Sequence, residues 1–268
     1  MHGCPPAGVK GQLRRQVMLG CVPDLVLLRH GESVWNAENR FTGWTDVDLS
    51  ATGEDEARAA GRLLADEGDL DLQVVHTSVL TRAVRTANLA LEEMGRSWLP
   101  VRRHWRLNER HYGDLTGRNK ADTAEAYGPE QVRAWRRGYS TPPPAVPASD
   151  ERHPATDARY RHVPARELPA TECLADVVAR LVPYFVDAIV PDLLALGGVL
   201  VVAHGNSLRA MVKYLETIGD EEIVDLDIPT GIPRRYRLGR DLSIEEVGYL
   251  GDQDAARAAA EAVARQAG

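Results

Sequence analysis

The fold is decided by the stretch LVLLRHGE at residues 25–32, where an apolar run ends in a polar turn that contains glycine. A second stretch, VLVVAHGN at residues 199–206, has the same form. Short, β-branched apolar runs of this kind are typical of buried parallel strands. In open α/β sheets, ligands bind beyond the carboxyl ends of such strands. The sequence therefore predicts an α/β protein in which His30, preceded by Arg29, and His204 share a site that transfers an anionic group.

The composition restricts the class of protein and the partners that it can bind. The chain has 268 residues, of which 44% are hydrophobic and 26% charged, which is ordinary for a globular protein with a substantial core. The net charge of −7 argues against general nucleic-acid binding, so an anionic substrate needs a local cluster of basic residues. No apolar run approaches the ~18 residues of a transmembrane helix. We therefore expect neither nucleic acid nor a membrane as a partner.

The cysteines indicate the compartment. Cys4, Cys21 and Cys173 show no metal-ligand spacing, and an odd number cannot all pair within one chain. They fit reduced thiols, which are typical of a cytoplasmic protein.

Three segments depart from the pattern of a compact domain. Residues 1–23 show no periodicity and are predicted to be a disordered extension, so that the folded domain begins near Asp24. The prolines in residues 139–169 forbid regular structure and leave two interpretations, a functional lid or a disordered insert. The Ala-rich residues 252–268 are predicted to be a tail, either a weak helix or frayed.

The rest of the chain alternates between strand and helix patterns. Further strands are predicted at 73–76, near 101, at 235–238 and at 245–248. Helices are predicted after three capping residues, Thr52, Ser78 and Thr171, and over 119–137 with a break at residues 128–129. Pro183 is expected to kink the helix that follows Thr171.

His30 is the candidate nucleophile, because imidazole titrates near neutrality and attacks phosphorus well. Arg29 beside it can bind phosphate oxygens in a forked geometry that lysine cannot supply. His204 can stabilise the transferring group or hold His30 in place, and the backbone N–H groups of Gly205 and Asn206 open a helix and can face the same anion. A lone histidine is more often a simple loop residue, but two copies of the pattern reverse that preference.

Two further residues carry alternative interpretations from the sequence. Arg82 lies in the first turn of a helix, where the dipole disfavours a cation, so it binds either an anion or only solvent. Glu109 is the best general acid or base, because a water-poor anion site can bring the pKa of a carboxyl toward neutrality. Otherwise Glu109 forms a surface ion pair with Arg110. Lys120, Arg136 and Arg137 are similarly either anion ligands or a solvated basic face.

Together the motifs resemble the cofactor-dependent phosphoglycerate mutases of the histidine phosphatase superfamily. The resemblance extends over about residues 24–251 and lies in ordered motifs: LLRHGES at 27–33 with WN at 35–36, NRFTGW at 39–44 with DVDLS at 46–50, TSVL at 77–80 with RA at 82–83, LNERHYG at 107–113, WRRG at 135–138, and AHGNSLR at 203–209. The motifs at 107–113 and 135–138 are features that simple phosphatases of the superfamily lack.

The resemblance implies a three-layer α/β/α sandwich around a mixed, mostly parallel sheet, with residues 24–251 as the catalytic domain. It implies that 3-phosphoglycerate and 2-phosphoglycerate are interconverted through a phosphohistidine at His30, primed by 2,3-bisphosphoglycerate and without a metal. Glu109 would shuttle the hydroxyl proton, and Arg29, Arg82 and His204 would hold the transferring phosphoryl group. The residues expected to bind substrate are Ser33, Asn36, Thr42, Gly43, Arg110, His111, Tyr112, Lys120, Arg136, Arg137, Gly205 and Asn206. The family also implies a homodimer or homotetramer.

Two alternatives have distinct signatures. A phosphatase would use the same phosphohistidine step with water as the acceptor, and the 107–113 and 135–138 motifs argue against it. A non-catalytic scaffold of the same fold would tolerate the loss of His30, Glu109 or His204, yet all three are present.

Overall fold

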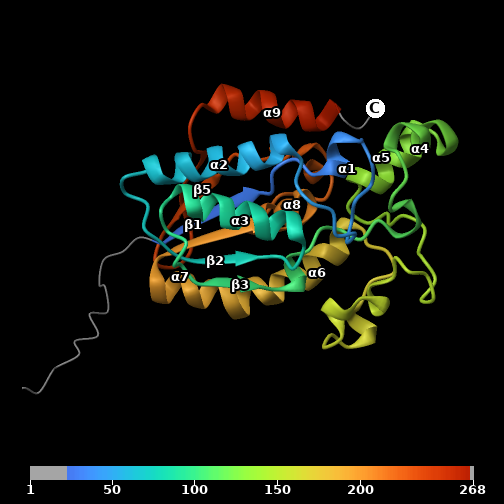
Figure 1. Ribbon diagram of the computed structural model, residues 1–268, viewed down its shortest axis with the longest axis horizontal. Coiled ribbons are helices and arrows are strands. Elements are labelled where there is room, and N and C mark those ends of the chain that lie inside the picture. The colour runs from blue at the N-terminus through green and yellow to red at the C-terminus, as the bar shows by residue number, and fades with distance from the viewer. Residues whose placement is uncertain (1–22, 266–268) are drawn as a thin grey trace, which may run out of the picture.

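The computed structural model describes residues 23–265 of the chain, and side chains as far as residue 261. Figure 1 shows a central sheet between two layers of helices. The strands are β1 (Asp24–Arg29), β2 (Leu72–Thr77), β3 (Val101–Arg103), β4 (Gly198–Ala203), β5 (Arg234–Leu238) and β6 (Ile244–Tyr249). The α-helices are α1 (Val34–Ala37), α2 (Ala51–Asp66), α3 (Thr81–Glu93), α4 (Lys120–Tyr127), α5 (Pro129–Arg137), α6 (Leu174–Tyr184), α7 (Val190–Leu196), α8 (Gly205–Glu216) and α9 (Gln253–Arg265).

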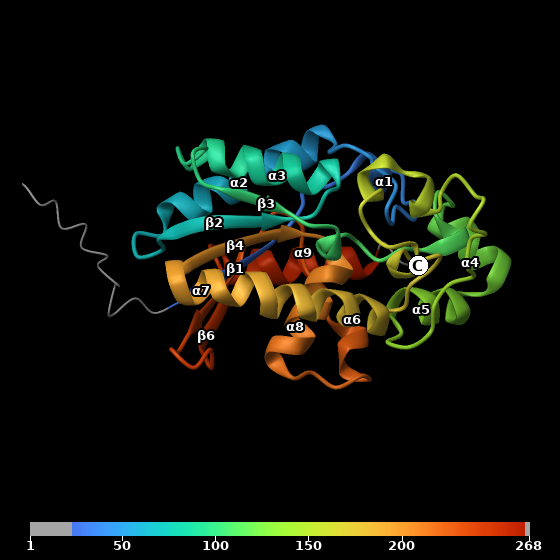
Figure 2. The same ribbon diagram turned by 90° about the horizontal axis from the view of Figure 1, so that it is seen from below.

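The strands lie side by side in the order β3-β2-β4-β1-β5-β6. Strands β1 to β4 pair in parallel, whereas β5 and β6 are antiparallel to their neighbours. Helices α2 and α3 cover one face of the sheet and α6, α7 and α8 the other, which the rotated view of Figure 2 makes clear. This arrangement confirms the predicted three-layer α/β/α sandwich around a mixed sheet.

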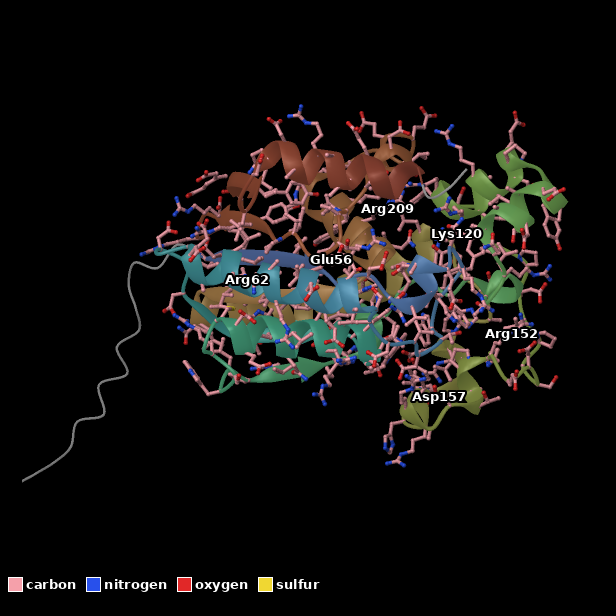
Figure 3. All side chains as sticks on the ribbon, turned by 45° about the horizontal axis from the view of Figure 1, so that its top comes forward. Glu56, Arg62, Lys120, Arg152, Asp157 and Arg209 are labelled. Carbon is pink, nitrogen blue, oxygen red and sulfur yellow. The ribbon has the colours of Figure 1, made fainter. Side chains whose placement is uncertain are left out.

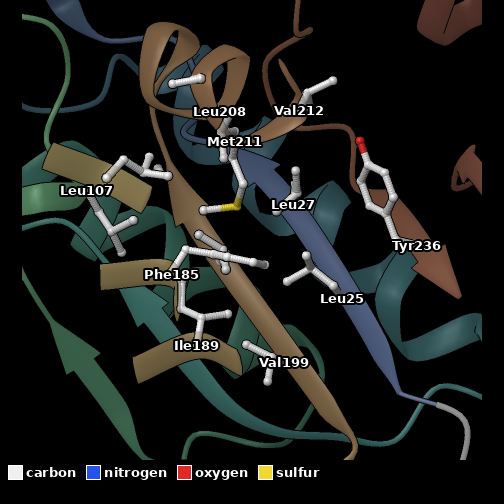
Figure 4. Packing of buried hydrophobic residues seen from close by; sticks show 14 of the residues in the cluster. Leu25, Leu27, Leu107, Phe185, Ile189, Val199, Leu208, Met211, Val212 and Tyr236 are labelled. Atoms are coloured by element: carbon white, nitrogen blue, oxygen red, sulfur yellow. The ribbon is translucent and has the colours of Figure 1, made fainter. Parts of the chain in front are cut away.

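The core follows from the alternation of side chains along the central strand β1. Leu25 and Leu27 point toward the face covered by α6 and α8, where they belong to the same buried cluster as Phe185 (Figure 4). Val26 and Leu28 point to the opposite face, in the cluster beneath α2 and α3. Burial on both faces explains why this strand is continuously apolar.

The pairing of β1 with β4 brings the two histidine motifs together. In the parallel register Arg29 lies opposite Ala203, so His30 and His204 leave the sheet at neighbouring positions. The turn after β1 then packs backbone against backbone on α2. A Cβ atom at Gly31 would lie 2.1 Å from the carbonyl oxygen of Gly53, so only glycine allows this approach.

Helix starts were predicted less well than helix interiors. Helix α2 begins after Ser50, whose Oγ accepts the Gly53 N–H at 3.1 Å, so the prediction of Thr52 as the cap is wrong. The predicted cap Ser78 lies before the Leu80 cap of α3 and accepts the Leu80 N–H outside the helix. Because α3 begins with no side-chain cap at all, a nearby Ser or Thr does not by itself fix the residue at which a helix begins.

The long helix before β4 also begins later than predicted. Helix α6 starts after Cys173, while the hydroxyl of the predicted cap Thr171 donates to the Pro143 carbonyl at 2.8 Å. Pro183 lies inside α6, and a π-helical turn over Phe185–Ile189 follows it before α7 continues. The helix thus continues past Pro183 through a π-helical turn, which contains one more residue than an α-helical turn.

Residues 139–169 contain short 3₁₀ turns at Pro154–Thr156, Ala158–Tyr160 and Ala165–Glu167, as expected for their proline content. The segment nevertheless packs on the domain. Tyr160 is 2% exposed, and its hydroxyl accepts a hydrogen bond from Asn108 Nδ2 at 2.9 Å.

The two ends of the chain were predicted to lie outside the domain. The prediction for residues 1–23 falls outside the described residues except for Pro23, whose carbonyl accepts the Leu238 N–H at 2.9 Å. Residues 253–265 form α9, in which Ala256 is fully buried. Within residues 23–265, no helix is long and apolar enough to span a membrane.

Candidate active site

A cavity that opens to solvent lies beyond the carboxyl ends of β1 and β4. Figure 3 labels two of its residues, Lys120 at the start of α4 and Arg209 on α8, and also Arg152 and Asp157 of the proline-rich segment, residues 139–169. The predicted site residues that line it are Arg29, His30, Asn36, Thr42, Gly43, Arg82, Glu109, Tyr112, Lys120, Arg136, Arg137, Gly205 and Asn206. The structure thus brings residues that lie more than 170 positions apart in the sequence together around His30.

The structure holds the His30 imidazole in its neutral form. Its Nδ1 lies 2.7 Å from the Gly31 carbonyl, which only accepts, so Nδ1 carries the proton. The lone pair is then on Nε2, the atom beside Arg82 Nε at 3.3 Å. Burial, followed by the charges of Arg82 and Arg29, lowers the pKa of His30 well below its usual range. The imidazole therefore stays neutral at physiological pH and available for attack.

The two arginines beside His30 are fixed by backbone carbonyls rather than by carboxylates. Arg82 donates from Nη2 to Gly43 O at 2.7 Å and from Nη1 to Thr45 O at 3.0 Å, which leaves Nε directed at His30. Arg29 donates from Nη1 to Ile228 O at 2.7 Å. Burial lowers the pKa of both guanidinium groups, that of Arg82 to about 10. A bound anion would offset this cost.

His204 lies behind His30 as the N-cap of α8, with the two ring centroids 4.9 Å apart. Its Nε2 pairs with Ser78 Oγ at 2.8 Å, so the serine predicted as a helix cap instead orients this histidine. Burial, followed by the charge of Arg82, lowers the pKa of His204 well below its usual range. The second histidine is therefore also neutral and held in place.

Glu109 faces the start of α8 and not the surface. Its Oε1 accepts the backbone N–H groups of Arg110 at 2.8 Å and Asn206 at 3.0 Å. The Asn206 N–H, which we predicted from the sequence to face a bound anion, therefore donates to this carboxylate. Glu109 is also a lining residue of the cavity that contains His30, and this location fits a proton shuttle better than the surface ion pair with Arg110.

The lining of the cavity contains further cations, Lys120, Arg136 and Arg137. Burial, followed by the charges of Arg136 and Arg29, lowers the pKa of Lys120 to about 7. Arg137 donates to Asp227 Oδ1 at 2.6 Å and is partly neutralised. Within the described residues, no group of three or more His, Cys, Asp or Glu side chains is placed to hold a metal ion.

Three predicted binding residues have other surroundings. Ser33 is fully buried and caps α1, where its Oγ donates to Asn36 Oδ1 at 2.8 Å. His111 contacts the proline-rich segment, with Nε2 3.2 Å from the Arg152 carbonyl. Arg110 is fully buried, stacks 4.8 Å from the Tyr112 ring, and donates to Arg136 O at 2.6 Å. None of the three is among the residues that line the cavity.

Sequence reasoning missed Arg209 and Asp227, which also line the cavity. Arg209 donates from Nη1 to Asn206 Oδ1 at 2.9 Å and so orients a predicted binding residue. A signal was available, because Arg209 lies among the buried apolar residues Leu208 and Ala210 on α8. An arginine at such a position needs a polar partner. Asp227 lies in a loop, and no local pattern identifies it.

Comparison with known proteins agrees with this geometry. Residues 25–163 match the family profile of the histidine phosphatase superfamily (branch 1). A protein of Thermobifida fusca (strain YX) is 59% identical over 90% of this chain and 98% of its own length. A protein of Nitratidesulfovibrio vulgaris (strain Miyazaki F) is 59% identical over 90% of this chain and 97% of its own. Both are named 2,3-bisphosphoglycerate-dependent phosphoglycerate mutase.

Solved structures share the fold at lower identity. A protein titled mycobacterial hydrolase 1 has a TM-score of 0.65 and 23% identity over 87% of this chain and 99% of its own. A mycobacterial glucosyl-3-phosphoglycerate phosphatase in complex with VO3 has a TM-score of 0.62 and 26% identity over 85% of this chain and 97% of its own. The fold, the histidine pair and the identity over nearly the whole chain lead to one conclusion: the chain belongs to the 2,3-bisphosphoglycerate-dependent phosphoglycerate mutase family of the histidine phosphatase superfamily.

Proposed function

We propose that the protein interconverts 3-phosphoglycerate and 2-phosphoglycerate through a phosphohistidine at His30. The observation that carries this proposal is the convergence of a neutral histidine, a carboxylate and a set of cations on one cavity. The identity of 59% to two named mutases supports the choice of substrate. Arg29 and Arg209 both line the cavity, and the buried Nε atom of each has no hydrogen-bond partner, which fits the binding of anionic groups at this site.

The chemical step begins at His30 Nε2. A bond forms from this nitrogen to phosphorus as the bond from phosphorus to the substrate oxygen breaks, and 2,3-bisphosphoglycerate supplies the priming phosphoryl group. Arg82 and Arg29 stabilise the charge on the phosphoryl oxygens, and His204 supports the imidazole from behind. Phosphoryl transfer depends mainly on such positioning and charge stabilisation, so the fixed guanidinium groups provide most of the catalysis.

Glu109 transfers the proton to and from the substrate oxygen. When phosphoryl leaves for His30, the substrate oxygen takes a proton from the Glu109 carboxyl, and Glu109 recovers it when a hydroxyl attacks the phosphohistidine. The other end of the substrate, with its carboxylate and second phosphate, binds Lys120, Arg136 and Arg137, which also line the cavity. Return of phosphoryl from the other carbon then completes the isomerisation.

The proline-rich residues 139–169 are proposed to exclude water from the phosphohistidine. None of these residues, all within the described range, lines the cavity. They support its wall: Arg159 pairs with Asp46 at 2.7 Å, next to Thr45, whose carbonyl fixes Arg82. The segment therefore acts as a brace for the wall rather than as a flap over the opening.

We propose that residues 24–251 form the catalytic domain and 252–268 a tail, that the enzyme needs no metal, and that it works in the cytoplasm as a homodimer or homotetramer. Light scattering coupled to gel filtration measures the assembly directly.

The test is conversion of 3-phosphoglycerate to 2-phosphoglycerate in EDTA, with and without catalytic 2,3-bisphosphoglycerate. We expect metal-independent conversion that rises with the bisphosphate. Release of inorganic phosphate without isomerisation would instead identify a phosphatase, and neither activity would identify a binding protein of this fold.

A further inference from the structure

A buried ion pair lies behind the loop that carries Glu109. Arg180 on α6 and Glu172 just before this helix are 9% and 2% exposed, and Arg180 Nε donates to Glu172 Oε1 at 2.6 Å. Neither residue is among those that line the active-site cavity. Removing two charges from water is costly, so a buried pair of this kind calls for a specific role.

The pair contacts the backbone of the Glu109 loop at several points. Arg180 Nη2 lies 2.9 Å from the Glu109 carbonyl and 3.0 Å from that of Asn108, while Nη1 donates to Arg106 O at 2.6 Å. Glu172 Oε2 accepts the His111 N–H at 2.7 Å. One guanidinium and one carboxylate thus hold the loop on both sides of Glu109.

A second donor binds the same carbonyl. Trp44 Nε1 donates to Glu109 O at 2.5 Å, and the Arg180 guanidinium lies 5.6 Å from the Trp44 ring centroid. On the cavity side, the hydrogen bonds that residues 23–261 give to the Glu109 carboxylate come from the N–H groups of Arg110 and Asn206 and go to Oε1. The position of its carboxylate therefore depends on where Arg180 and Trp44 fix its backbone.

We propose that Arg180 is a positioning residue for proton transfer, which holds the Glu109 carboxylate at its working distance from the substrate oxygen. This inference rests on the proposed role of Glu109 as the proton shuttle. Only a guanidinium has enough donors in one plane to reach three carbonyls and a carboxylate together. Lysine keeps the charge opposite Glu172 but loses this geometry.

A double-mutant cycle tests the proposal. Glu109→Gln alone is expected to lower kcat for the mutase reaction by roughly 10²–10⁴-fold, the usual size of an acid–base effect. Arg180→Lys alone is expected to lower kcat by about 10- to 100-fold, with KM for 3-phosphoglycerate changed by no more than about threefold. In the Glu109→Gln background, Arg180→Lys should lower kcat further by less than about threefold.

The outcomes distinguish a failure of the positioning role of Arg180 from a failure of the proton-shuttle role of Glu109. If the two losses in kcat multiply while Glu109→Gln is impaired, Arg180 does not act through Glu109 and the inference is wrong. If KM rises and kcat is unchanged in Arg180→Lys, the inference is also wrong. Near-normal turnover of Glu109→Gln itself would instead remove the proton role of Glu109 from the proposed function.

Two further variants guard against a simple loss of folding. Trp44→Phe removes the other donor to Glu109 O but keeps the ion pair, and it should show the same cycle with a smaller loss. Arg235→Lys is the matched control, because Arg235 is also 9% exposed and pairs with a buried carboxylate, Asp24, at 2.8 Å. It should leave kcat unchanged; an equal loss of kcat in this control would show that any buried arginine has this effect.

Discussion

The two ends of strand β1 show two ways to bury an arginine. At its start, Asp24 binds Arg235 of the neighbouring strand through Nε at 2.8 Å and Nη2 at 3.0 Å, and Asp69 also contacts Arg235 at 2.7 Å. At its end, Arg29 is bound by the carbonyl of Ile228. Both arginines are 9% exposed, so burial alone does not distinguish them.

The difference lies in the surrounding charge. The hydrogen bond to Asp24 raises the pKa of Arg235, whereas desolvation lowers the pKa of Arg29. The carboxylates at the first end neutralise the cation and make a structural unit. At the second end, Arg29, Arg82 and Lys120 gather with less carboxylate nearby, which is favourable only when an anion binds. Uncompensated buried charge thus marks the functional end of the sheet.

The strongest way to break the functional end is His30→Ala. This variant is expected to abolish phosphoryl transfer, because no other group in the cavity carries the phosphoryl. Incubation with radiolabelled 2,3-bisphosphoglycerate measures formation of the phosphoenzyme. His162→Ala, which changes an exposed histidine, is the control and should label normally. Labelling of His30→Ala would place the nucleophile elsewhere.

Removing one cation from each end sharpens the comparison. Arg235→Met leaves Asp24 buried without its partner and should lower the free energy of unfolding by about 3–5 kcal/mol, with kcat and KM unchanged. Lys120→Met should leave the free energy of unfolding unchanged or raised, but increase KM for 3-phosphoglycerate by about 10- to 100-fold, the loss of a charged hydrogen bond. Urea unfolding and steady-state kinetics measure both. A large loss of stability in Lys120→Met would contradict the distinction.

The pH dependence of 3-phosphoglycerate binding tests whether Lys120 is a cation without a compensating carboxylate. The pKa of Lys120 is about 7 in the protein alone, and a bound anion raises it, so above pH 7 binding takes up a proton. KM for 3-phosphoglycerate should therefore rise as pH increases above 7, by at most about tenfold per pH unit. Lys120→Arg stays charged and should flatten the profile, whereas Lys213→Arg should not change it. A wild-type KM that is constant from pH 7 to 9 would contradict this assignment.

The smallest expected effect concerns the proline-rich residues 139–169, which support the cavity wall. Deleting residues 142–164 should raise hydrolysis of 2,3-bisphosphoglycerate relative to mutase activity by roughly three- to tenfold, because water then reaches the phosphohistidine more easily. The control is Tyr160→Phe, which loses the hydrogen bond to Asn108 but keeps the ring against Trp44. An unchanged ratio in the deletion would remove residues 139–169 from this role.

Sequence patterns predicted what depends on neighbours along the chain. The apolar runs at 25–28 and 199–203 form strands, Gly128 separates α4 from α5, and the prolines of 139–169 exclude longer elements. Motifs also indicated most residues of the cavity. Periodicity and turn chemistry are local, so they can be recognised without knowing the fold.

The tertiary structure decided what depends on competition between distant segments. It chose Ser50 over Thr52 as a cap, directed His111 toward Arg152 and brought Ser78 to His204. It also placed Arg180 behind Glu109, on a helix that no local signal connects to that loop. The sequence by itself determined the elements and the chemical groups available. The pairing of β1 with β4 and the packing of α6 determined which groups meet, because these contacts depend on burial and charge across the whole domain.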